Sequence, residues 1–448
     1  MTKRYLICFS GELTNFKLPE LESIAKIYNI DIKYDKSAWD NVDTDNDSPF
    51  LYIEVNSEED IVKIAKRSIL IRHIYEIFSE GIEFKELLNG LNSNYTTEYL
   101  SDYLIGKTFK FEVEAYGRKH SQKQKLSIME EFNDTPLWVN GTACMKPKPE
   151  QMENHIRWFA IEDWGRLGKD IRKRFFGKRI CDGGRETIIK FNLTDRGYLG
   201  TTTMDPELSL ISANMALVNK GDMMLDPFVG TGSFLYVSAH YGAYVIGCDI
   251  DMKQMKKQED LNLETNFEQY KLTDQFLGIV LSDNSIPTWR MNNTFDQIIT
   301  DPPYGIRAGA KRVGPKDNRK DVVIPLELQR DHIPQYVDYS VPEVMKDLLL
   351  LAAKTLKVGG RLVYWLPCSA TDFKISELPT HPCLRLLYHQ CYQGLSLKWG
   401  RRLITMEKHL EYQEASDDQL GQLNPQHANL RSIVHPKIQD NNNKQSLN

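Results

Sequence analysis

Five consecutive residues, Asp301-Pro302-Pro303-Tyr304-Gly305, carry an unusual combination of side chains directly after a short apolar run. The run, residues 295–300, is typical of a buried strand, which would put the Asp301 carboxylate at the strand end. An ionised carboxylate only accepts hydrogen bonds, and the two prolines give the Pro302 carbonyl a set direction. Two fixed acceptors suit a nucleobase amine, and Tyr304 offers a ring on which the base can stack. A proline-rich turn with a surface tyrosine explains the same five residues, so the motif needs a second feature.

A glycine-rich segment, residues 227–233, supplies that second feature. It joins a predicted strand that ends at Asp226 to a predicted helix over residues 234–241. Such a turn lets a ligand approach the backbone closely at the N-terminus of a helix. The segment lacks the lysine of a P-loop and does not match G-x-G-x-x-G, which disfavours a nucleoside triphosphate and a dinucleotide.

Two further predicted strands, residues 244–248 and 276–281, are also followed by acids, Asp249 and Asp283. In open α/β sheets the ligand crevice lies outside the carboxyl ends of the strands. Asp249 there suits the two hydroxyls of a ribose, and Asp283 the edge of an adenine. Taken singly, each aspartate also fits a helix cap or a loop acid. Together with Asp226 and Asp301, these two acids make four at successive strand ends, a pattern that favours a nucleotide-like ligand.

The elements that must position these acids alternate between strand and helix from about residue 206 to residue 363, which predicts βαβ units and a parallel sheet. Residues 1–90 predict a small α+β module, and residues 91–192 a second one. Residues 306–340 form a long basic loop, and residues from 414 onward form a polar tail that we expect to be disordered.

Basic and aromatic residues are mixed in the second half of the second module, over residues 154–179. Cations meet phosphates and rings stack on bases, so this mixture fits an RNA surface. A solvated face over an ordinary core explains it equally well. The rings concerned are Trp158, Phe159, Trp164, Phe175 and Phe176.

The amino-acid composition limits the kinds of site and the cellular compartment that fit this chain. The 448 residues carry a net charge of −5, so attraction to nucleic acid must come from local clusters among the 56 Lys and Arg. The seven cysteines contain no C-x-x-C pair, so we expect no metal site, and a reducing compartment is favoured. No apolar stretch is long enough for a membrane span. We therefore expect a soluble cytoplasmic protein.

The motifs together resemble a known family. Residues 225–233 with Asp301-Pro302-Pro303-Tyr304-Gly305 resemble S-adenosyl-L-methionine-dependent amino-methyltransferases. Residues 203–205 with 207–211, and the long basic loop after Gly305, narrow the resemblance to the eukaryotic and archaeal tRNA guanosine-N2 methyltransferases that modify position ten.

The resemblance implies a fold. Residues 1–90 would be a ferredoxin-like α+β module, residues 91–192 a THUMP RNA-binding domain and residues 414–448 a disordered tail. Residues 193–413 would be a Rossmann-like class I methyltransferase domain whose seven-stranded sheet has the order 3-2-1-4-5-7-6.

The resemblance also implies site residues. Those expected to hold the target base are Asp301, Pro302 and Tyr304, and those expected to bind S-adenosyl-L-methionine are Asp226, Pro227, Gly230, Gly232, Asp249 and Asp283. The basic residues expected to contact tRNA are Arg118, Lys119, Lys123, Arg172, Lys173, Arg174, Lys178, Arg179, Arg307, Lys311 and Arg312.

The eukaryotic members of this family are typically catalytic subunits of a heterodimer with a small zinc-binding activator. If the strand order holds, residues 276–281 form a sheet edge without charge or proline, which attracts other strands. We expect the activator to add a strand there, although residues 265–275 or the N-terminal modules are alternative covers.

Two other functions fit parts of the sequence. A DNA adenine-N6 or cytosine-N4 methyltransferase uses the same acid and prolines, but the basic aromatic module favours RNA. A non-catalytic RNA-binding protein would explain the module but not the four intact acids.

Overall fold

The computed structural model describes residues 2–36, 48–94, 103–135, 142–200, 203–251, 255–258, 261–286, 288–290, 292–303, 310–314 and 335–414. The chain divides into two compact units. Unit 1 holds residues 1–12 and 28–185, and unit 2 holds residues 13–27 and 186–448. None of the helices in these described ranges combines the length and apolar character needed to cross a membrane. Tyr304, Arg307 and the tail from residue 415 lie outside the described residues.

Unit 1 is built on a sheet that, among the described residues, has seven strands in the order β2-β1-β3-β7-β6-β4-β5. All of its pairs are antiparallel except β4 with β6 and β4 with β5. The strands are β1 (Lys3–Phe9), β2 (Phe50–Val55), β3 (Ile71–Gly81), β4 (Thr108–Tyr116), β5 (Thr142–Ala143), β6 (His155–Asp163) and β7 (Lys173–Asp182). The sheet therefore runs through both modules expected on either side of residue 90, and β3 pairs with β7 across that position.

Three longer helices pack on this sheet: α3 (Glu58–Arg67), α4 (Phe84–Asn94) and α6 (Gln122–Glu130), with a short η3 (Pro149–Asn154) before β6. Ser57 caps α3 by accepting a hydrogen bond from the Asp60 N–H at 3.1 Å. Trp158 and Phe176 lie in one apolar cluster, and Phe159 and Phe175 in another. Both faces of the central strands are thus covered.

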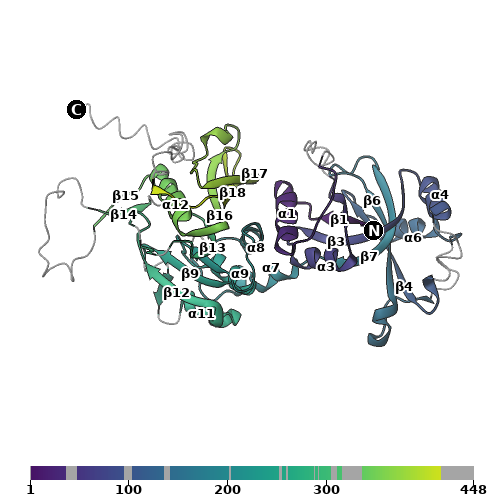
Figure 1. Ribbon diagram of the computed structural model, residues 1–448. Coiled ribbons are helices and arrows are strands. Elements are labelled where there is room, and N and C mark those ends of the chain that lie inside the picture. Colours follow the sequence, from purple (N-terminus) through teal and green to yellow (C-terminus); the bar gives the residue numbers. More distant parts are fainter. Residues whose placement is uncertain are drawn as a thin grey trace, which may run out of the picture. The chain divides into compact units, whose positions relative to one another are not determined.

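Unit 2 contains the predicted Rossmann-like domain (Figure 1). Within the described residues its main sheet has seven strands in the order β12-β9-β8-β13-β16-β18-β17. When the seven strands of this sheet are numbered 1 to 7 in chain order, their order in the sheet is 3-2-1-4-5-7-6. The predicted strand order is therefore confirmed. The strands are β8 (Met223–Asp226), β9 (Tyr244–Asp249), β12 (Phe276–Leu281), β13 (Phe295–Thr300), β16 (Leu356–Ser369), β17 (Leu384–Gly394) and β18 (Trp399–Lys408).

The first five strands are parallel, and β18 and β17 are antiparallel to them. The helices of this unit are α7 (Glu186–Lys190), α8 (Pro206–Met215), α9 (Ser233–His240), α11 (Leu263–Tyr270) and α12 (Val341–Thr355). Short pieces complete it: η4 (Leu193–Asp195), η5 (Thr273–Gln275), η8 (Ile375–Glu377), and the pairs β10 (Lys256–Gln258) with β11 (Leu261–Asn262) and β14 (Lys311–Val313) with β15 (Tyr336–Asp338). The β14–β15 pair lies within the expected long loop.

Helix α8 has a clear local signal at its start. Pro206 is its first residue, and Asp205 accepts hydrogen bonds from the Glu207 and Leu208 N–H groups at 2.8 and 3.3 Å. Every residue of α8 except Glu207 is buried, so the helix is a core element rather than a surface one.

The N-terminal helix α1 (Lys17–Ile27), preceded by η1 (Thr14–Phe16), belongs to unit 2. It packs against α8, where Asn214 donates to the Glu20 carboxylate at 2.8 Å, and both side chains are fully buried. Arg361 of β16 donates to the Ser23 hydroxyl at 3.1 Å. A segment at the start of the chain is therefore a structural part of the unit that contains the four acids.

Candidate active site

The four aspartates lie at the carboxyl ends of four neighbouring strands. Asp249 and Asp226 are the last residues of β9 and β8, Asp301 directly follows β13, and Asp283 lies two residues after β12. Since β12, β9, β8 and β13 are adjacent in this order and parallel, the acids share one edge of the sheet. The structure thus brings together the acids that the sequence singled out.

The glycine-rich turn between β8 and α9 lies at the same edge. The Gly230 N–H donates to Asp249 Oδ2 at 3.0 Å, which joins the turn to the end of β9. Gly230 and Gly232 have positive φ values of 48° and 81°, a conformation that favours glycine. A Cβ added to Gly230 would meet nothing within 4 Å, whereas one added to Gly232 would collide with Leu263. The backbone at Gly230 is therefore open to a ligand.

Asp226 is nearly inaccessible and is held by neighbours on two elements. It accepts the Thr300 hydroxyl at 2.7 Å and the Phe228 N–H at 3.1 Å. Burial outweighs these hydrogen bonds and raises the pKa of Asp226 to about 8. Asp226 therefore acts first as a link between the ends of β8 and β13.

Asp249 and Asp283 are both engaged by backbone N–H groups. Asp249 also accepts from Asp251 at 2.9 Å, and burial raises its pKa. Asp283 accepts from Ser285 at 2.8 Å and from Val313 of β14 at 2.5 Å. The base of the long loop after Asp301 is thus hydrogen-bonded to the acid expected near an adenine.

Asp301 is the acid closest to the predicted chemistry. Its Oδ2 accepts from Arg401 of β18 at 3.1 Å, while its Oδ1 is buried and has no hydrogen-bond partner among the described residues. Burial raises the pKa of Asp301 to about 7, against the opposing effect of the Arg401 guanidinium. Pro302 is buried directly beside it. The ring expected to stack on the base, Tyr304, lies outside the described residues.

Sequence reasoning missed two of these partners. Thr300 was assigned only to the strand, and Arg401 was not considered because it is distant in sequence from every motif. The pair Arg401-Arg402 directly before the apolar Leu403 and Ile404 was the available signal, because an arginine beside a core strand is rarely buried unless it is paired.

The basic residues expected to contact RNA are divided between exposed and paired positions. Arg118, Lys119 and Lys123 are exposed around the end of β4 and the start of α6, and Arg118 stacks over Trp164 at 4.6 Å. All four basic residues of β7 are ion-paired within the sheet, with partners that the sequence did not reveal: Lys173 with Glu80, Arg174 with Glu162, Lys178 with Glu76 and Arg179 with Glu114. Arg172 precedes β7, and Lys311 and Arg312 lie in β14, where Arg312 pairs with Glu343.

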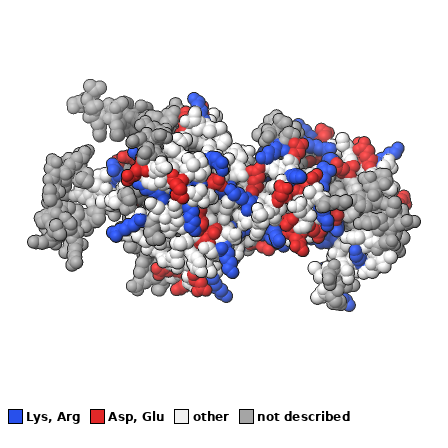
Figure 2. All heavy atoms as spheres, in the orientation of Figure 1, with Lys and Arg blue, Asp and Glu red and all other residues white. Residues whose placement is uncertain are grey.

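Four of the five aromatic residues between these charges are core residues, so the alternative interpretation of an ordinary core is confirmed for them, whereas Trp164 is half-buried. Trp158, Phe159 and Phe176 are fully inaccessible and Phe175 is 3% exposed, because both faces of β6 and β7 are covered by apolar clusters. On the face of unit 1 seen in Figure 2, basic and acidic side chains are interspersed rather than separated.

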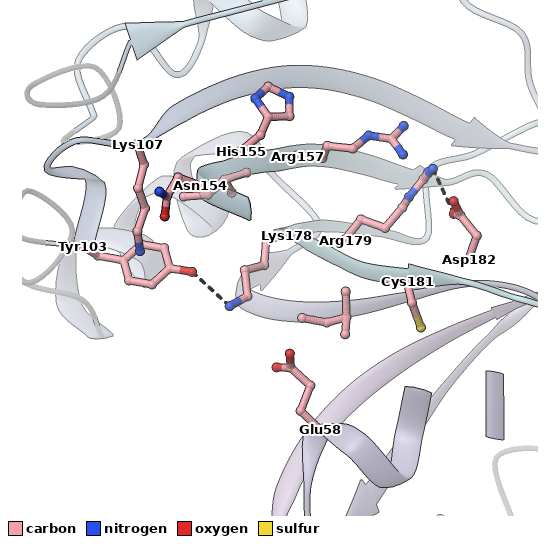
Figure 3. A pocket seen from close by; sticks show the side chains of 12 residues that line it. Glu58, Tyr103, Lys107, Asn154, His155, Arg157, Lys178, Arg179, Cys181 and Asp182 are labelled. Carbon is pink, nitrogen blue, oxygen red and sulfur yellow. Dashed lines mark hydrogen bonds and ion pairs between the residues drawn. The ribbon is translucent and has the colours of Figure 1, made fainter. Parts of the chain in front are cut away.

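Unit 1 also has a polar pocket of about 390 Å³ beside the ends of β6 and β7. Figure 3 shows Lys178 directed toward the Tyr103 hydroxyl, a hydrogen bond of 3.0 Å, and Arg179 toward Asp182 at 3.4 Å. The Lys107 ammonium lies over the Tyr103 ring, 3.6 Å from its centre. The charged residues that line the pocket are four cations, Lys107, Arg157, Lys178 and Arg179, and two acids, Glu58 and Asp182.

Two family descriptions match most of the chain. The family description "Tmrp11 THUMP N-terminal domain" matches residues 3–183, and "RMKL-like, methyltransferase domain" matches residues 194–316. A solved structure similar to this chain, TrmN from Thermus thermophilus, has a TM-score of 0.43 and 14% identity, covering 90% of this chain and 99% of its own.

Two curated relatives carry the name tRNA (guanine(10)-N(2))-methyltransferase TRMT11. The relative from Dictyostelium discoideum is 54% identical over 98% of this chain and 90% of its own length. The relative from Mus musculus is 36% identical over 92% of this chain and 89% of its own length. The chain therefore belongs to the tRNA (guanine(10)-N(2))-methyltransferase TRMT11 family.

Proposed function

We propose that this chain transfers a methyl group from S-adenosyl-L-methionine to the exocyclic N2 of guanosine 10 in tRNA. The observation that carries the proposal is the position of Asp301 directly after β13. The preceding residue, Thr300, is hydrogen-bonded to Asp226, which ends β8 just before the glycine-rich turn. The family to which the chain belongs carries that activity in its name.

The edge of the sheet suits S-adenosyl-L-methionine. The open backbone at Gly230 accepts the approach of a ligand, with Asp226 and Pro227 before it and Gly232 at the start of α9. Asp249 at the end of β9 would hold the ribose, and Asp283 the adenine. The bound cofactor supplies an electrophilic methyl group on a positively charged sulfur.

The target amine is a poor nucleophile because its lone pair is delocalised into the guanine ring. Asp301 Oδ1 and the Pro302 carbonyl would accept its two N–H groups and localise the lone pair toward the methyl carbon. Positioning of this kind is worth up to ~7–11 kcal/mol in intramolecular analogues. The nitrogen–carbon bond forms as the sulfur–carbon bond breaks, and the surplus proton leaves the amine. With its pKa near 7, Asp301 is suited to accept that proton near neutral pH.

Unit 1 would bind the tRNA. Its exposed cations Arg118, Lys119 and Lys123 provide local positive charge in a chain whose net charge is −5. At the pocket of Figure 3, Arg157, Lys178 and Arg179 are paired with acids, and Lys107 lies over the Tyr103 ring. Guanosine 10 must leave its base stack, which costs a few kcal/mol, and stacking on Tyr304 at ~1–3 kcal/mol would offset part of that cost.

The sharpest test of the proposal uses a tRNA transcript in which inosine replaces guanosine 10, because inosine lacks the exocyclic amine. Wild-type protein with its partner should form N2-methylguanosine in the normal transcript and nothing in the inosine transcript. Asp301→Ala should abolish methylation while S-adenosyl-L-methionine binding, followed by calorimetry, persists. Loss of cofactor binding together with activity would assign Asp301 a structural role, and methylation of another nucleotide would refute the proposal.

The second part of the proposal is that a small zinc-binding activator adds a strand to β12. Strand β12 is an outer strand of its sheet, and within the described residues it pairs only with β9. Leu277 and Leu281 are 50% and 56% exposed, although Phe276 stacks on Phe267 of α11 at 4.3 Å. An apolar edge of this kind favours strand addition.

Hydrogen exchange tests this edge, with the other outer strand of the same sheet, β17, as a matched control. Adding the activator should slow exchange of the amides of β12 and leave β17 unchanged. Protection of β17 alone, or of neither strand, would contradict the proposed interface. A cytoplasmic location belongs to the same proposal and is supported by the seven cysteines, none of which is in a disulfide.

A further inference from the structure

Arg401 reaches the site from the antiparallel part of the sheet. On β18 it lies opposite Pro367 of β16 and Gln393 of β17. Its guanidinium lies over the ring of Trp365, 4.6 Å from the centre, and Trp365 is fully buried. The side chain therefore crosses β16 toward β13, supported on a ring that cannot move away.

Each of the three nitrogens of the Arg401 guanidinium has a partner. Nε donates to Gln393 Oε1 at 2.7 Å, Nη1 to Asp301 Oδ2 at 3.1 Å, and Nη2 contacts Met204 Sδ at 3.2 Å. Because the guanidinium is planar, these contacts fix its orientation as well as its position. Because three partners hold its guanidinium, Arg401 fixes the position of the Asp301 carboxylate.

The two oxygens of Asp301 are consequently unequal. Oδ2 is occupied by Arg401, and Oδ1 is buried with no hydrogen-bond partner among the described residues. A buried, unpaired carboxylate oxygen is costly unless a ligand completes it. We propose that Arg401 is the positioning residue of this site, which holds Oδ2 so that Oδ1 receives the N–H of the guanine amine and keeps the carboxylate ionised. The inference rests on the proposed function and adds a residue to it.

The charges around Asp301 make this role measurable through pH. Arg401 from β18 favours the anion, whereas burial disfavours it. The ionised Asp301 in turn raises the pKa of Asp226 at the end of β8. Asp205, the cap of α8, faces Arg401 rather than Asp301. Removing the cation would therefore raise the pKa of Asp301 further, so that a larger share of the carboxyl is protonated and unable to accept at neutral pH.

The test compares Arg401→Met, Arg401→Lys and Arg402→Met in the full-length chain with its partner. Arg402 is the matched control, because it is the adjacent residue on β18, donates to the His389 carbonyl at 3.3 Å and stacks over Phe373. Single-turnover methylation of tRNA is measured against pH at saturating S-adenosyl-L-methionine, together with cofactor affinity and melting temperature.

Arg401→Met should slow methylation about 100-fold at neutral pH, the scale seen when one electrostatic partner is removed from an active site. Its acid limb should move upward by about one pH unit or more, with cofactor affinity unchanged. Arg401→Lys should restore the acid limb and part of the rate, and Arg402→Met should keep the wild-type profile even if its melting temperature falls.

Two outcomes overturn the inference. Equal slowing of Arg401→Met at every pH, without rescue by lysine, would make Arg401 only a packing residue. Unchanged methylation by Arg401→Met would show that Asp301 needs no such support. If instead the wild-type protein fails to methylate guanosine 10, the proposed function fails before Arg401 is tested.

Discussion

Thr300 donates its hydroxyl to Asp226 at 2.7 Å, and this hydrogen bond joins the carboxyl ends of β13 and β8. Thr300 immediately precedes Asp301, and Asp226 immediately precedes the glycine-rich turn. This buried contact therefore links the residue before Asp301 to the residue before the cofactor turn, in addition to the backbone pairing of β13 with β8. The residues around it lead to several testable predictions.

The first prediction concerns the stability of the cofactor-free protein against pH. The pKa of Asp226 is about 8 in the folded chain and near 3.8 when unfolded, so between these values the unfolded state binds fewer protons. Stability contributed by Asp226 should therefore fall as pH rises from about 4 to 8, by up to roughly 1.4 kcal/mol per pH unit, and level off above. Asp226→Asn should remove that slope.

The measurement is the difference in unfolding free energy between wild type and Asp226→Asn, from urea titrations at several pH values, which cancels the other titrating groups. Thr300→Val serves as a contrast, because it removes the hydroxyl but keeps the shape. Since that hydroxyl lowers the pKa of Asp226, its loss should carry the decline in stability to higher pH without changing the slope. A difference that is flat from pH 5 to 9 would show that Asp226 is not buried as a neutral acid.

The second prediction compares two glycines of the same unit. Gly230 and Gly221 both have positive φ, and a Cβ added to either meets nothing within 4 Å. An alanine at either position should cost about 1 kcal/mol of stability through backbone strain. Gly221 lies just before the start of β8, away from the acids, so only Gly230→Ala should weaken S-adenosyl-L-methionine binding, by about tenfold or more.

Calorimetric titration of the cofactor and melting temperatures of both variants check this prediction. Equal losses of affinity in the two variants would mean that the effect comes from strain alone and that the ligand does not approach Gly230.

The third prediction concerns helix α1. Glu20 and Asn214 are fully buried and joined at 2.8 Å, so truncating either one removes a buried hydrogen bond. Glu20→Ala and Asn214→Ala should each lower the unfolding free energy of unit 2 by about 1–3 kcal/mol. The double variant should lose less than the sum, since both changes remove the same interaction. Additive losses in urea titrations would refute a direct coupling.

The fourth prediction concerns tRNA binding. Arg118 and Lys119 are exposed, whereas Lys173 and Arg174 are neutralised by Glu80 and Glu162. Replacing Arg118 and Lys119 by alanine should reduce the slope of log affinity against log salt by about two, because each phosphate contact releases roughly one counterion. An unchanged slope, measured by filter binding at several salt concentrations, would move the RNA surface elsewhere in unit 1.

Much of the catalytic unit was predictable because its signals are local. The run before each acid is apolar and short, the glycine turn has a recognisable pattern, and Pro206 with Asp205 marks the start of α8. The strand order came from the family resemblance to which these motifs led. Local patterns determine which residue follows which strand, and a parallel sheet then brings strand ends together.

Contacts between distant parts of the chain were not predictable in this way. Nothing in the sequence pattern of helix α1 indicates that Glu20 is buried against Asn214. Aromatic residues such as Trp158 and Phe176 also occur on surfaces that stack on RNA bases. Only the folded structure shows that these two rings are buried in an apolar cluster. Arg401 is 100 residues from Asp301, so its pairing emerges only from the antiparallel return of β18.

The membership of residues 13–27 in unit 2 has a consequence during protein synthesis. The ribosome completes α1 early, then makes residues 28–185 before the first of its packing partners in unit 2 is produced. At ~5–20 residues per second, the helix waits on the order of ten to thirty seconds with its apolar side unburied. A nascent chain of this length offers chaperones a defined target, and expression of the catalytic unit from residue 186 onward omits a piece that no downstream sequence replaces.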